Sequence, residues 1–180
     1  LYQTDFQNQV VVDIEQGDKI RIYNLEGESY STSLQIDASI EPVEGLELKF
    51  AQKWNETKTT YTGNQGADYM PFVAKYRSLA QVAYSAWQNK WDINVTLQNI
   101  GPSRIPAKGE IEEAWSPNFN LLSGQFTRRF KKFDWYIGIE NALNYTQKNP
   151  IRSVDNPFSE DFDAAMIWGP VMGRKVYSGI

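Results

Sequence analysis

Apolar and polar side chains alternate along much of the chain with a period of two residues. Between residues 33 and 54, large apolar side chains recur at every second position for most of the length, and Ser, Gln, Asp, Glu and Lys occupy most positions between them. The tetrapeptide Pro42-Val43-Glu44-Gly45 divides this region and is typical of a tight turn, because Pro presets φ and Gly accepts a positive φ. Two alternating runs joined by such a turn predict a β-hairpin.

The same pattern recurs and predicts an all-β fold, an antiparallel up-and-down meander of about eight strands. No segment of useful length has the i, i+3, i+4, i+7 apolar spacing of an amphipathic helix, so helix is expected to be a minor element. The expected strands are residues 2–14, 19–41, 45–58, 72–87, 90–100, 117–131, 133–141 and 172–180.

The connections between these strands are of two kinds. Tight turns lie at Val43-Glu44, Gln88-Asn89 and Lys131-Lys132, whereas the long connections are residues 59–71, 101–117 and 142–173. Because antiparallel strands alternate in direction, the tight turns lie at one end of the sheet and the long connections at the other. This asymmetry is typical of outer-membrane barrels, and a tilted membrane strand needs only about 9–11 residues.

Aromatic residues favour the same interpretation, because several lie toward strand ends, as in the girdles of membrane barrels. They are Tyr2, Trp54, Tyr84, Trp87, Trp91, Tyr136 and Tyr177. A soluble β-sandwich or a lipocalin-like barrel alternates in the same way with its apolar face inward, and on pattern alone it stays an alternative.

Composition excludes several functional classes. The 180 residues include no Cys and no His, which removes disulfide scaffolds, thiolate metal sites and Ser-His triads. The 18 basic and 22 acidic side chains give a net charge of −4, which argues against nucleic-acid binding. The longest apolar run, residues 164–168, is far shorter than the roughly 20 residues of a membrane helix. The chain begins at Leu1 without a signal-peptide pattern, so it is interpreted as a mature chain or an excised piece.

Three charged clusters could carry chemistry. Carboxylates at Asp155, Glu160, Asp161 and Asp163 suit Ca²⁺ but lack the spacing and glycine of an EF-hand loop. The carboxylates at Glu110, Glu112 and Glu113 could act as an acid/base pair. Both clusters are interpreted as charged loops, so no catalytic, cofactor-binding or metal-binding residue is expected. The basic run at residues 128–132 is interpreted as an interfacial cluster near lipid headgroups.

The C-terminal part of the chain carries a series of motifs in a characteristic order. They are Tyr136-Ile-Gly-Ile-Glu-Asn-Ala-Leu-Asn144, Gln147-Lys-Asn-Pro-Ile151, Asp155-Asn-Pro-Phe158, Ile167-Trp-Gly-Pro170 and Gly173-Arg-Lys-Val-Tyr-Ser-Gly-Ile180. This series resembles the C-terminal end of TonB-dependent outer-membrane receptors, particularly those of Bacteroidetes type. In those receptors the penultimate strand ends in a Glu-Asn-Leu-Phe-Asn-like motif and the last strand begins with Gly-Arg. Residues 2–12 and 23–30 look like upstream strands of the same family, so the resemblance covers the whole chain.

The resemblance implies a barrel of about 22 strands around a plug, in the bacterial outer membrane. Residues 1–180 would be a single piece of that barrel, its C-terminal segment, without the plug. The implied partners are outer-membrane lipid, the rest of the barrel with its plug, the TonB complex through the missing N-terminal region, and the barrel-assembly machinery. The residues of the family motif and of the final, assembly-directing strand are Glu140, Asn141, Asn144, Gly173, Arg174, Val176, Tyr177, Gly179 and Ile180.

The resemblance also sets the direction of the strands, with the tight turns in the periplasm and residues 142–173 as the last extracellular loop. Alternation then assigns a lipid-facing set, which is Leu34, Ile36, Ile40, Leu46, Leu48, Phe50, Ile93, Val95, Leu97, Ile137, Ile139, Val176 and Ile180. The lumen-facing set is Gln35, Asp37, Lys49, Lys53, Asp92, Asn94 and Gln98.

The function implied is energised uptake of a scarce nutrient, such as a metal chelate, cobalamin or an oligosaccharide, without enzymatic activity and without a cofactor. Two alternatives come from other classes. One is a complete eight-stranded outer-membrane barrel with a structural or adhesin role, and the other is a soluble β-sandwich binding module.

Overall fold

The structure, a computed structural model, describes residues 1–14, 20–62, 66–106, 114–159 and 162–180. All regular secondary structure in these residues is β-strand. None of the described segments forms a helix long and apolar enough to cross a membrane.

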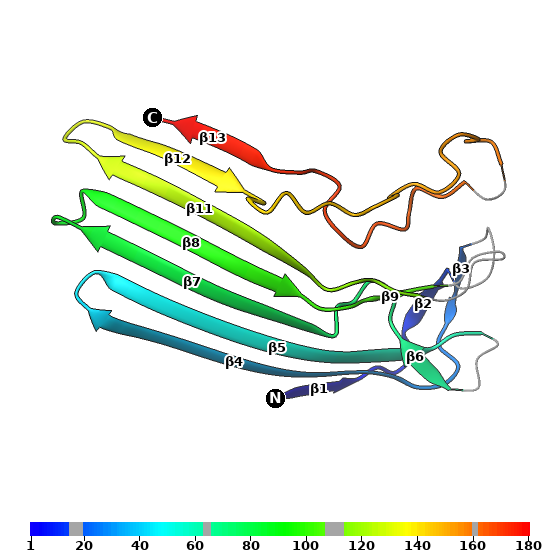
Figure 1. Cartoon of the computed structure of the whole chain (residues 1–180). Helices are drawn as coiled ribbons and strands as arrows, with labels where there is room; N and C mark the ends of the chain where they lie inside the picture. The colour runs from blue at the N-terminus through cyan, green and yellow to red at the C-terminus, as the bar shows by residue number, and fades with distance from the viewer. Residues whose placement is uncertain (15–19, 63–65, 107–113, 160–161) are drawn as a thin grey trace.

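One antiparallel sheet dominates the molecule (Figure 1). Along the sheet its strands are β1 (Tyr2–Asp5), β4 (Ser29–Val43), β5 (Leu46–Thr60), β7 (Tyr76–Ala86), β8 (Trp91–Ile100), β11 (Phe119–Arg129), β12 (Asp134–Glu140) and β13 (Lys175–Gly179). The short strand β6 (Ala67–Tyr69) pairs with the far end of β5. The predicted all-β meander of about eight strands is confirmed.

The first two predicted strands are wrong in their extent. Residues 2–14 and 19–41 are each interrupted, and β2 (Val10–Asp13) pairs with β3 (Arg21–Asn24) in a separate hairpin. The interruptions coincide with positive φ at Asn8 (54°) and Gly27 (132°), a conformation that ends an extended strand. Val11, which disturbs the alternation in the sequence, is 4% exposed within this hairpin.

The predicted asymmetry between the two ends of the sheet is confirmed (Figure 1). Residues 44–45, 87–90 and 130–133 form the tight turns at one end. The described parts of the segments 61–75, 101–118 and 141–174 form the other end, where β9 (Arg104–Ile105) pairs with β10 (Ala114–Trp115). The fourth predicted strand, residues 72–87, begins only at Tyr76, because Phe72 N–H donates to the carbonyl of Arg104 within the loops (3.0 Å).

Strand register divides the side chains of the sheet into an apolar face and a polar face. The apolar face carries every predicted lipid-facing residue that lies in a strand: Leu34, Ile36, Ile40, Leu46, Leu48, Phe50, Ile93, Val95, Leu97, Ile137, Ile139 and Val176. The polar face carries every predicted lumen-facing residue: Gln35, Asp37, Lys49, Lys53, Asp92, Asn94 and Gln98. Ile180 follows the end of β13.

The apolar face is not covered by any described part of the chain. Ile36 is 50% exposed and Val176 is 66% exposed, although both are large aliphatic side chains. The buried hydrophobic residues, Val11, Tyr61, Ala74, Ile105, Phe119 and Met166, lie in the β2–β3 hairpin and at the long-loop end of the sheet. A β-sandwich buries its apolar face against a second sheet, so the soluble β-sandwich alternative is wrong.

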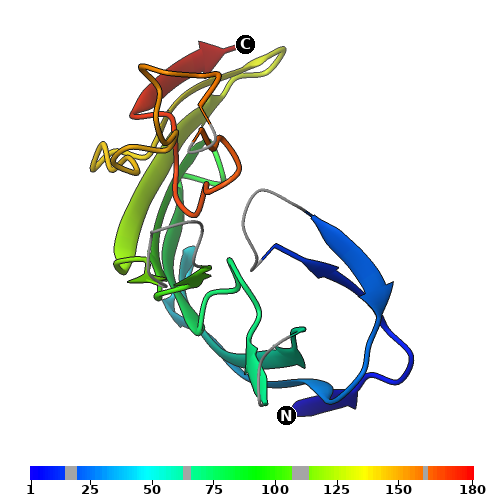
Figure 2. The ribbon, with the colours of Figure 1, turned by 90° about the vertical axis from the view of Figure 1, so that its right-hand side faces the viewer.

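The sheet is also open at both edges. The path of hydrogen-bonded strands runs from β1 to β13 and does not return, so the described strands do not close into a small barrel. Seen along its edge, the sheet forms a curved wall, with the β2–β3 hairpin on the concave side (Figure 2). The alternative of a complete eight-stranded barrel is therefore wrong for this structure.

Polar pairs interrupt the apolar face toward the long-loop end. Ser78 Oγ donates a hydrogen bond to Gln52 Oε1 on the neighbouring strand, and Asn99 Nδ2 donates to Asn120 Oδ1 at 2.7 Å. Register places these four side chains in one row across β5, β7, β8 and β11. Each polar side chain of the row thus has a partner in the row.

Candidate functional site

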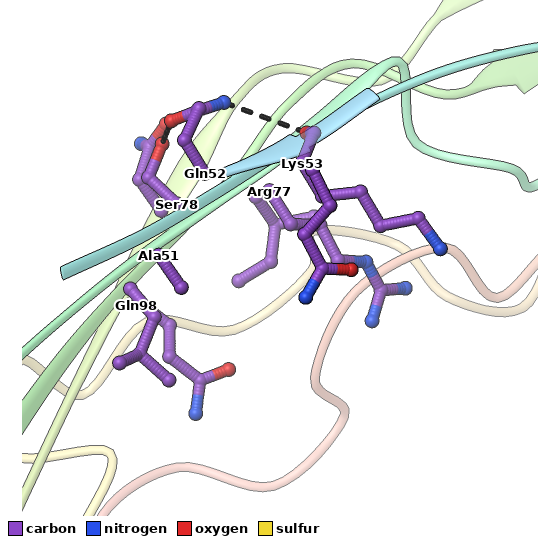
Figure 3. A pocket seen from close by; sticks show the side chains of 10 residues that line it. Ala51, Gln52, Lys53, Arg77, Ser78 and Gln98 are labelled. Carbon is purple, nitrogen blue, oxygen red and sulfur yellow. Dashed lines mark hydrogen bonds between the residues drawn. The ribbon is translucent and has the colours of Figure 1, made fainter. Parts of the chain in front are cut away.

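A pair of basic side chains marks the polar face near the long-loop end. Lys53 of β5 lies directly opposite Arg77 of β7, and Gln35 of β4 lies opposite Lys53 on its other side. Figure 3 shows Lys53 and Arg77 pointing away from Gln52 and Ser78, toward the side on which the last long segment returns. The polar face is therefore the concave face.

Two like charges directly opposite each other destabilise a strand pair. Among the described residues, neither Lys53 nor Arg77 forms a salt bridge. The nearest carboxylate in the register, Asp37, lies one row away and accepts a hydrogen bond from Gln35 Nε2 at 2.8 Å. An anionic group between Lys53 and Arg77 would relieve the repulsion, since a guanidinium and an ammonium both bind carboxylate and phosphate oxygens.

The basic pair borders a small hollow. It is lined by the pair and by Gln35, Ala51, Leu79, Gln98 and Ile100 of the polar face, and also by Gln52, Ser78 and Asn99, and its volume is about 180 Å³. Sites for whole drug-sized ligands measure roughly 300–1,000 Å³. The hollow can therefore hold one group of a larger ligand rather than the entire ligand.

The loops next to this hollow are held together by a buried arginine. Arg104 is 1% exposed, and its Nε donates to the carbonyl of Tyr69 at 2.6 Å while Nη1 lies 3.4 Å from Asp68 Oδ2. Beside it, the Lys75 ammonium lies 4.5 Å from the Tyr69 ring centre and 3.7 Å from that of Trp115. These contacts join β6, β9, β10 and Lys75, the residue before β7, so this part of the loop end is an ordered cluster.

Three residues of the family motif, Asn141, Asn144 and Arg174, connect the two ends of the last long segment, and we call them the clasp. Asn141 Nδ2 donates to the carbonyls of Tyr145 (2.7 Å) and Met172 (3.2 Å), and Asn141 Oδ1 accepts from Tyr145 N–H (3.0 Å). Asn144 Oδ1 accepts from the backbone N–H of Arg174 at 2.9 Å. Arg174 donates from Nε and Nη2 to the carbonyl of Ala142, at 3.0 and 2.7 Å. The two ends of segment 141–174 are therefore tied together.

Inside the same segment, the side chain of Gln147 connects the first part of the loop to residues 166–169 near its end. Its amide donates to the carbonyl of Met166 (2.8 Å) and accepts from the backbone N–H groups of Trp168 (2.9 Å) and Gly169 (3.0 Å). Tyr145 stacks on Phe119 with 4.8 Å between ring centres, and burial raises the pKa of the Tyr145 phenol. Sequence reasoning included Gln147 in a motif but did not assign it this role.

The other residues predicted for the family motif and the final strand lie at the junction of β12 and β13 or within β13. Glu140 ends β12 and pairs with Lys175 at the start of β13, and Gly173 lies against the Asn144 side chain. Val176 lies on the apolar face, opposite Ile139. Tyr177 and Gly179 lie on the polar face, opposite Gly138 and Tyr136 respectively.

The predicted aromatic girdle is correct in part. Trp54, Tyr84 and Trp91 lie on the apolar face, and Trp87 lies in the turn beside Trp91 with 5.7 Å between ring centres. Tyr2, Tyr136 and Tyr177 instead lie on the polar face, because their register partners are polar-face residues or glycines. Nearness to a strand end is not sufficient to assign a face.

Sequence reasoning also missed Arg77. In β7 the two alternating sets of side chains differ little in polarity, so only its pairing with Lys53 reveals its face. Of the acidic clusters, Glu110, Glu112, Glu113, Glu160 and Asp161 lie outside the described residues. Within the described residues, no group of three potential ligand side chains could hold a metal ion.

Comparison with known proteins identifies the fold but not a sequence family. No protein-family model and no curated protein matches the chain. The chain is similar to the structure of the ferric enterobactin receptor PfeA from Pseudomonas aeruginosa (G324V mutant), with a TM-score of 0.65 and 14% identity over 98% of this chain. It is also similar to the ferric-catecholate import receptor Fiu from Escherichia coli K12, with a TM-score of 0.59 and 14% identity over 79% of this chain.

The chain covers 27% of the PfeA chain and 20% of the Fiu chain, so it corresponds to a minor part of each receptor. At 14% identity the likeness shows the fold alone. The curved antiparallel sheet with long loops at one end thus has the fold of a segment of a receptor barrel.

Proposed function

We propose that the chain is part of the barrel wall of a TonB-dependent receptor in the bacterial outer membrane, which imports a scarce nutrient. The observation that carries the proposal is the uncovered apolar face, with Ile36, Val82 and Val176 exposed on a single-layered sheet. Lipid is the environment in which such a face is stable, and the fold it shares with two import receptors supports this interpretation.

In this proposal residues 1–180 are the C-terminal segment of a larger barrel of the Bacteroidetes type. The tight turns lie in the periplasm, and segment 141–174 is the last extracellular loop, kept in shape by the clasp of Asn141, Asn144 and Arg174. A plug, supplied elsewhere in the gene product, fills the lumen and rearranges when TonB pulls on it. The segment itself acts in transport rather than in catalysis, and β13 is the strand that the barrel-assembly machinery recognises.

The basic pair favours an anionic ligand. PfeA is a receptor for ferric enterobactin and Fiu imports ferric catecholates. Lys53 and Arg77 lie opposite each other on the polar face without a carboxylate partner in the part of the chain that the structure describes, which suits an anionic metal chelate better than a neutral oligosaccharide.

The proposal is tested by uptake in the organism that carries the gene. Deleting the gene should abolish growth on one limiting nutrient, and deleting TonB in the same strain should cause no further loss. Complementation with Lys53→Gln/Arg77→Gln should reduce uptake at low ligand concentration about tenfold or more, because two charge-assisted contacts are lost. Lys49→Gln, at a polar-face lysine two rows away on the same strand, is the matched control and should restore normal uptake.

Growth of the deletion strain on every metal chelate, cobalamin and oligosaccharide source at the parental rate would contradict the proposed transport function. Normal uptake by the double variant would leave transport intact and would contradict the role of the basic pair.

A further inference from the structure

An arginine interrupts the apolar face at the tight-turn end of the sheet. Arg128 of β11 lies between Trp91 of β8 and Trp135 of β12 in the strand register. Its guanidinium carbon is 3.8 Å from the Trp91 ring centre and 5.1 Å from that of Phe130. In the next row toward the middle of the sheet, the neighbours are aliphatic or aromatic: Tyr84, Ile93, Phe126 and Ile137. The cation therefore lies at the boundary of the apolar face.

Arg128 has no carboxylate partner among the described residues. The two carboxylates nearest in sequence and register, Asp92 and Asp134, belong to the polar face and form salt bridges with Arg129. The adjacent turns add exposed cations, Lys90 and Lys131 with its neighbour Lys132. On the apolar face, the positive charge of Arg128 thus has no carboxylate partner among the described residues, and three further cations lie in the adjacent turns.

A hollow without charged side chains lies directly beside this cation. Its lining consists of Tyr84, Ala86, Trp87, Trp91, Ile93 and Phe126. The Trp91 ring contacts Phe126 with 5.1 Å between ring centres, so Trp91 forms both the wall of the hollow and the platform for Arg128. An apolar hollow and an unpaired guanidinium share this one ring.

We propose that Arg128 and the hollow form a binding site for one anionic phospholipid of the leaflet on the tight-turn side. The lipid phosphate accepts hydrogen bonds from the exposed edge of the guanidinium, while an acyl chain lies against Trp87, Trp91 and Phe126. A guanidinium that lies over an aromatic ring, as that of Arg128 lies over Trp91, can still donate from its N–H edge to a phosphate in a bidentate manner. The lysines of the adjacent turns favour a headgroup with net negative charge.

The lipid site rests on the proposed location in the outer membrane. One experiment distinguishes failure of the lipid site from failure of the membrane location. The full gene product is reconstituted into nanodiscs with equal amounts of phosphatidylglycerol and phosphatidylcholine, released, and analysed by native mass spectrometry for retained lipid. The protein should keep phosphatidylglycerol about tenfold over phosphatidylcholine, and Arg128→Gln should bring the ratio close to one. Arg77→Gln, an exposed arginine of the polar face at the other end of the sheet, should keep the full preference.

Two further variants keep the test decisive. Arg128→Lys retains the positive charge but not the bidentate donor geometry of the guanidinium, and it should give an intermediate lipid ratio. This variant provides a test of the site even where Arg128→Gln does not assemble. Trp91→Ala should lower the total amount of retained phosphatidylglycerol, and soluble glycerol phosphate, which has no acyl chain, should not compete. Failure of the protein to enter nanodiscs would contradict the membrane location. Insertion without a phosphatidylglycerol preference, or an equal preference in an assembled Arg128→Gln or Arg128→Lys variant, would overturn the lipid site.

Discussion

The ring of Tyr177 lies over the bare Cα of Gly138, its direct partner on the neighbouring strand. The arrangement is repeated two residues along, where Tyr136 of β12 lies over Gly179 of β13. The two rings contact each other with 6.2 Å between centres, and Tyr177 Oη donates to Gln125 Oε1 at 3.0 Å. An aromatic ring covering a cross-strand glycine fixes the register of a strand pair. The register of the edge strand β13 is thus set by two reciprocal Gly-Tyr pairs.

Gly138→Ala should therefore weaken the attachment of β13. A methyl group at this position overlaps the Tyr177 ring, which must move and lose its hydrogen bond to Gln125. We expect a loss of about 1–3 kcal/mol in the free energy of unfolding, as for other overpacked sites. The temperature at which the protein loses its folded mobility in detergent gel electrophoresis measures the effect.

Gly124→Ala is the control for this prediction. Gly124 is also inside a strand, but a methyl group there approaches nothing closer than 3.5 Å, the carbonyl oxygen of Asn94. Equal transition temperatures for Gly138→Ala and the unaltered protein would show that the Tyr177 ring does not hold β13 in register.

Asn141→Ala should loosen the last long segment. The substitution removes three hydrogen bonds to Tyr145 and Met172 and leaves a positive φ of 48° on a residue that tolerates it less well than Asn. We expect faster cleavage of residues 145–172 by an added protease in intact cells, with the barrel itself still resistant.

The matched control is Asn149→Ala. Asn149 has a similar φ of 49° and is exposed, but it forms no side-chain hydrogen bond in the described structure. Comparable protease sensitivity in both alanine variants would mean that backbone conformation, and not the clasp, protects the segment.

The orientation of the sheet can be tested with single cysteines, because the chain has none of its own. Phe158, in the last long segment, is 98% exposed, and Lys132 is exposed in the tight turn between β11 and β12. A membrane-impermeant maleimide added to intact cells should label Phe158→Cys and not Lys132→Cys. After the outer membrane is opened, both variants should be labelled. The reverse pattern in intact cells would invert the proposed topology.

Val176→Asp/Ile180→Asp should prevent insertion of the barrel into the outer membrane. Val176 lies on the apolar face of the edge strand, and each substitution brings a carboxylate to the lipid side. The free-energy cost of each Asp on the lipid face is below the value of about 2–4 kcal/mol for Arg or Lys at mid-bilayer. Both substitutions lie in the strand that is proposed to be recognised during assembly. Membrane fractionation with immunoblotting measures the outcome.

Lys175→Gln controls for a general effect of altering β13, since Lys175 lies on the polar face opposite Glu140. It should reach the membrane at nearly normal abundance. Normal abundance of the double Asp variant as well would mean that β13 does not direct assembly by its apolar side chains.

Alternation predicted the two faces of the sheet correctly wherever it was strong, as at Ile36, Leu48 and Val95. Period-two spacing is a property of the extended chain itself, so it is independent of what the strand pairs with. The interruptions at Asn8 and Gly27 were missed because both residue types are also compatible with an extended strand, and only the β2–β3 pairing shows the break.

The site was less predictable than the fold, because it depends on register. Lys53 could be placed on the polar face from sequence, but its partner Arg77 could not, since only pairing brings residues 24 positions apart together. The girdle assignment of Tyr136 and Tyr177 rested on their position along a strand, whereas their neighbours Ile137 and Val176, both on the apolar face, already place the two rings on the polar face by alternation.

In the proposed outer-membrane barrel, the row of paired amides and hydroxyls across β5 to β11 would mark one boundary of the hydrocarbon core. On β8 this row is marked by Asn99, and the row of Arg128 is marked by Trp91, eight residues away. At about 3.3 Å per residue and a tilt of about 40°, the two polar rows are separated by about 20 Å along the bilayer normal. In that location, a bilayer with a thicker hydrocarbon core would have to become thinner around this segment, at a cost of a fraction of a kcal/mol per Å of mismatch.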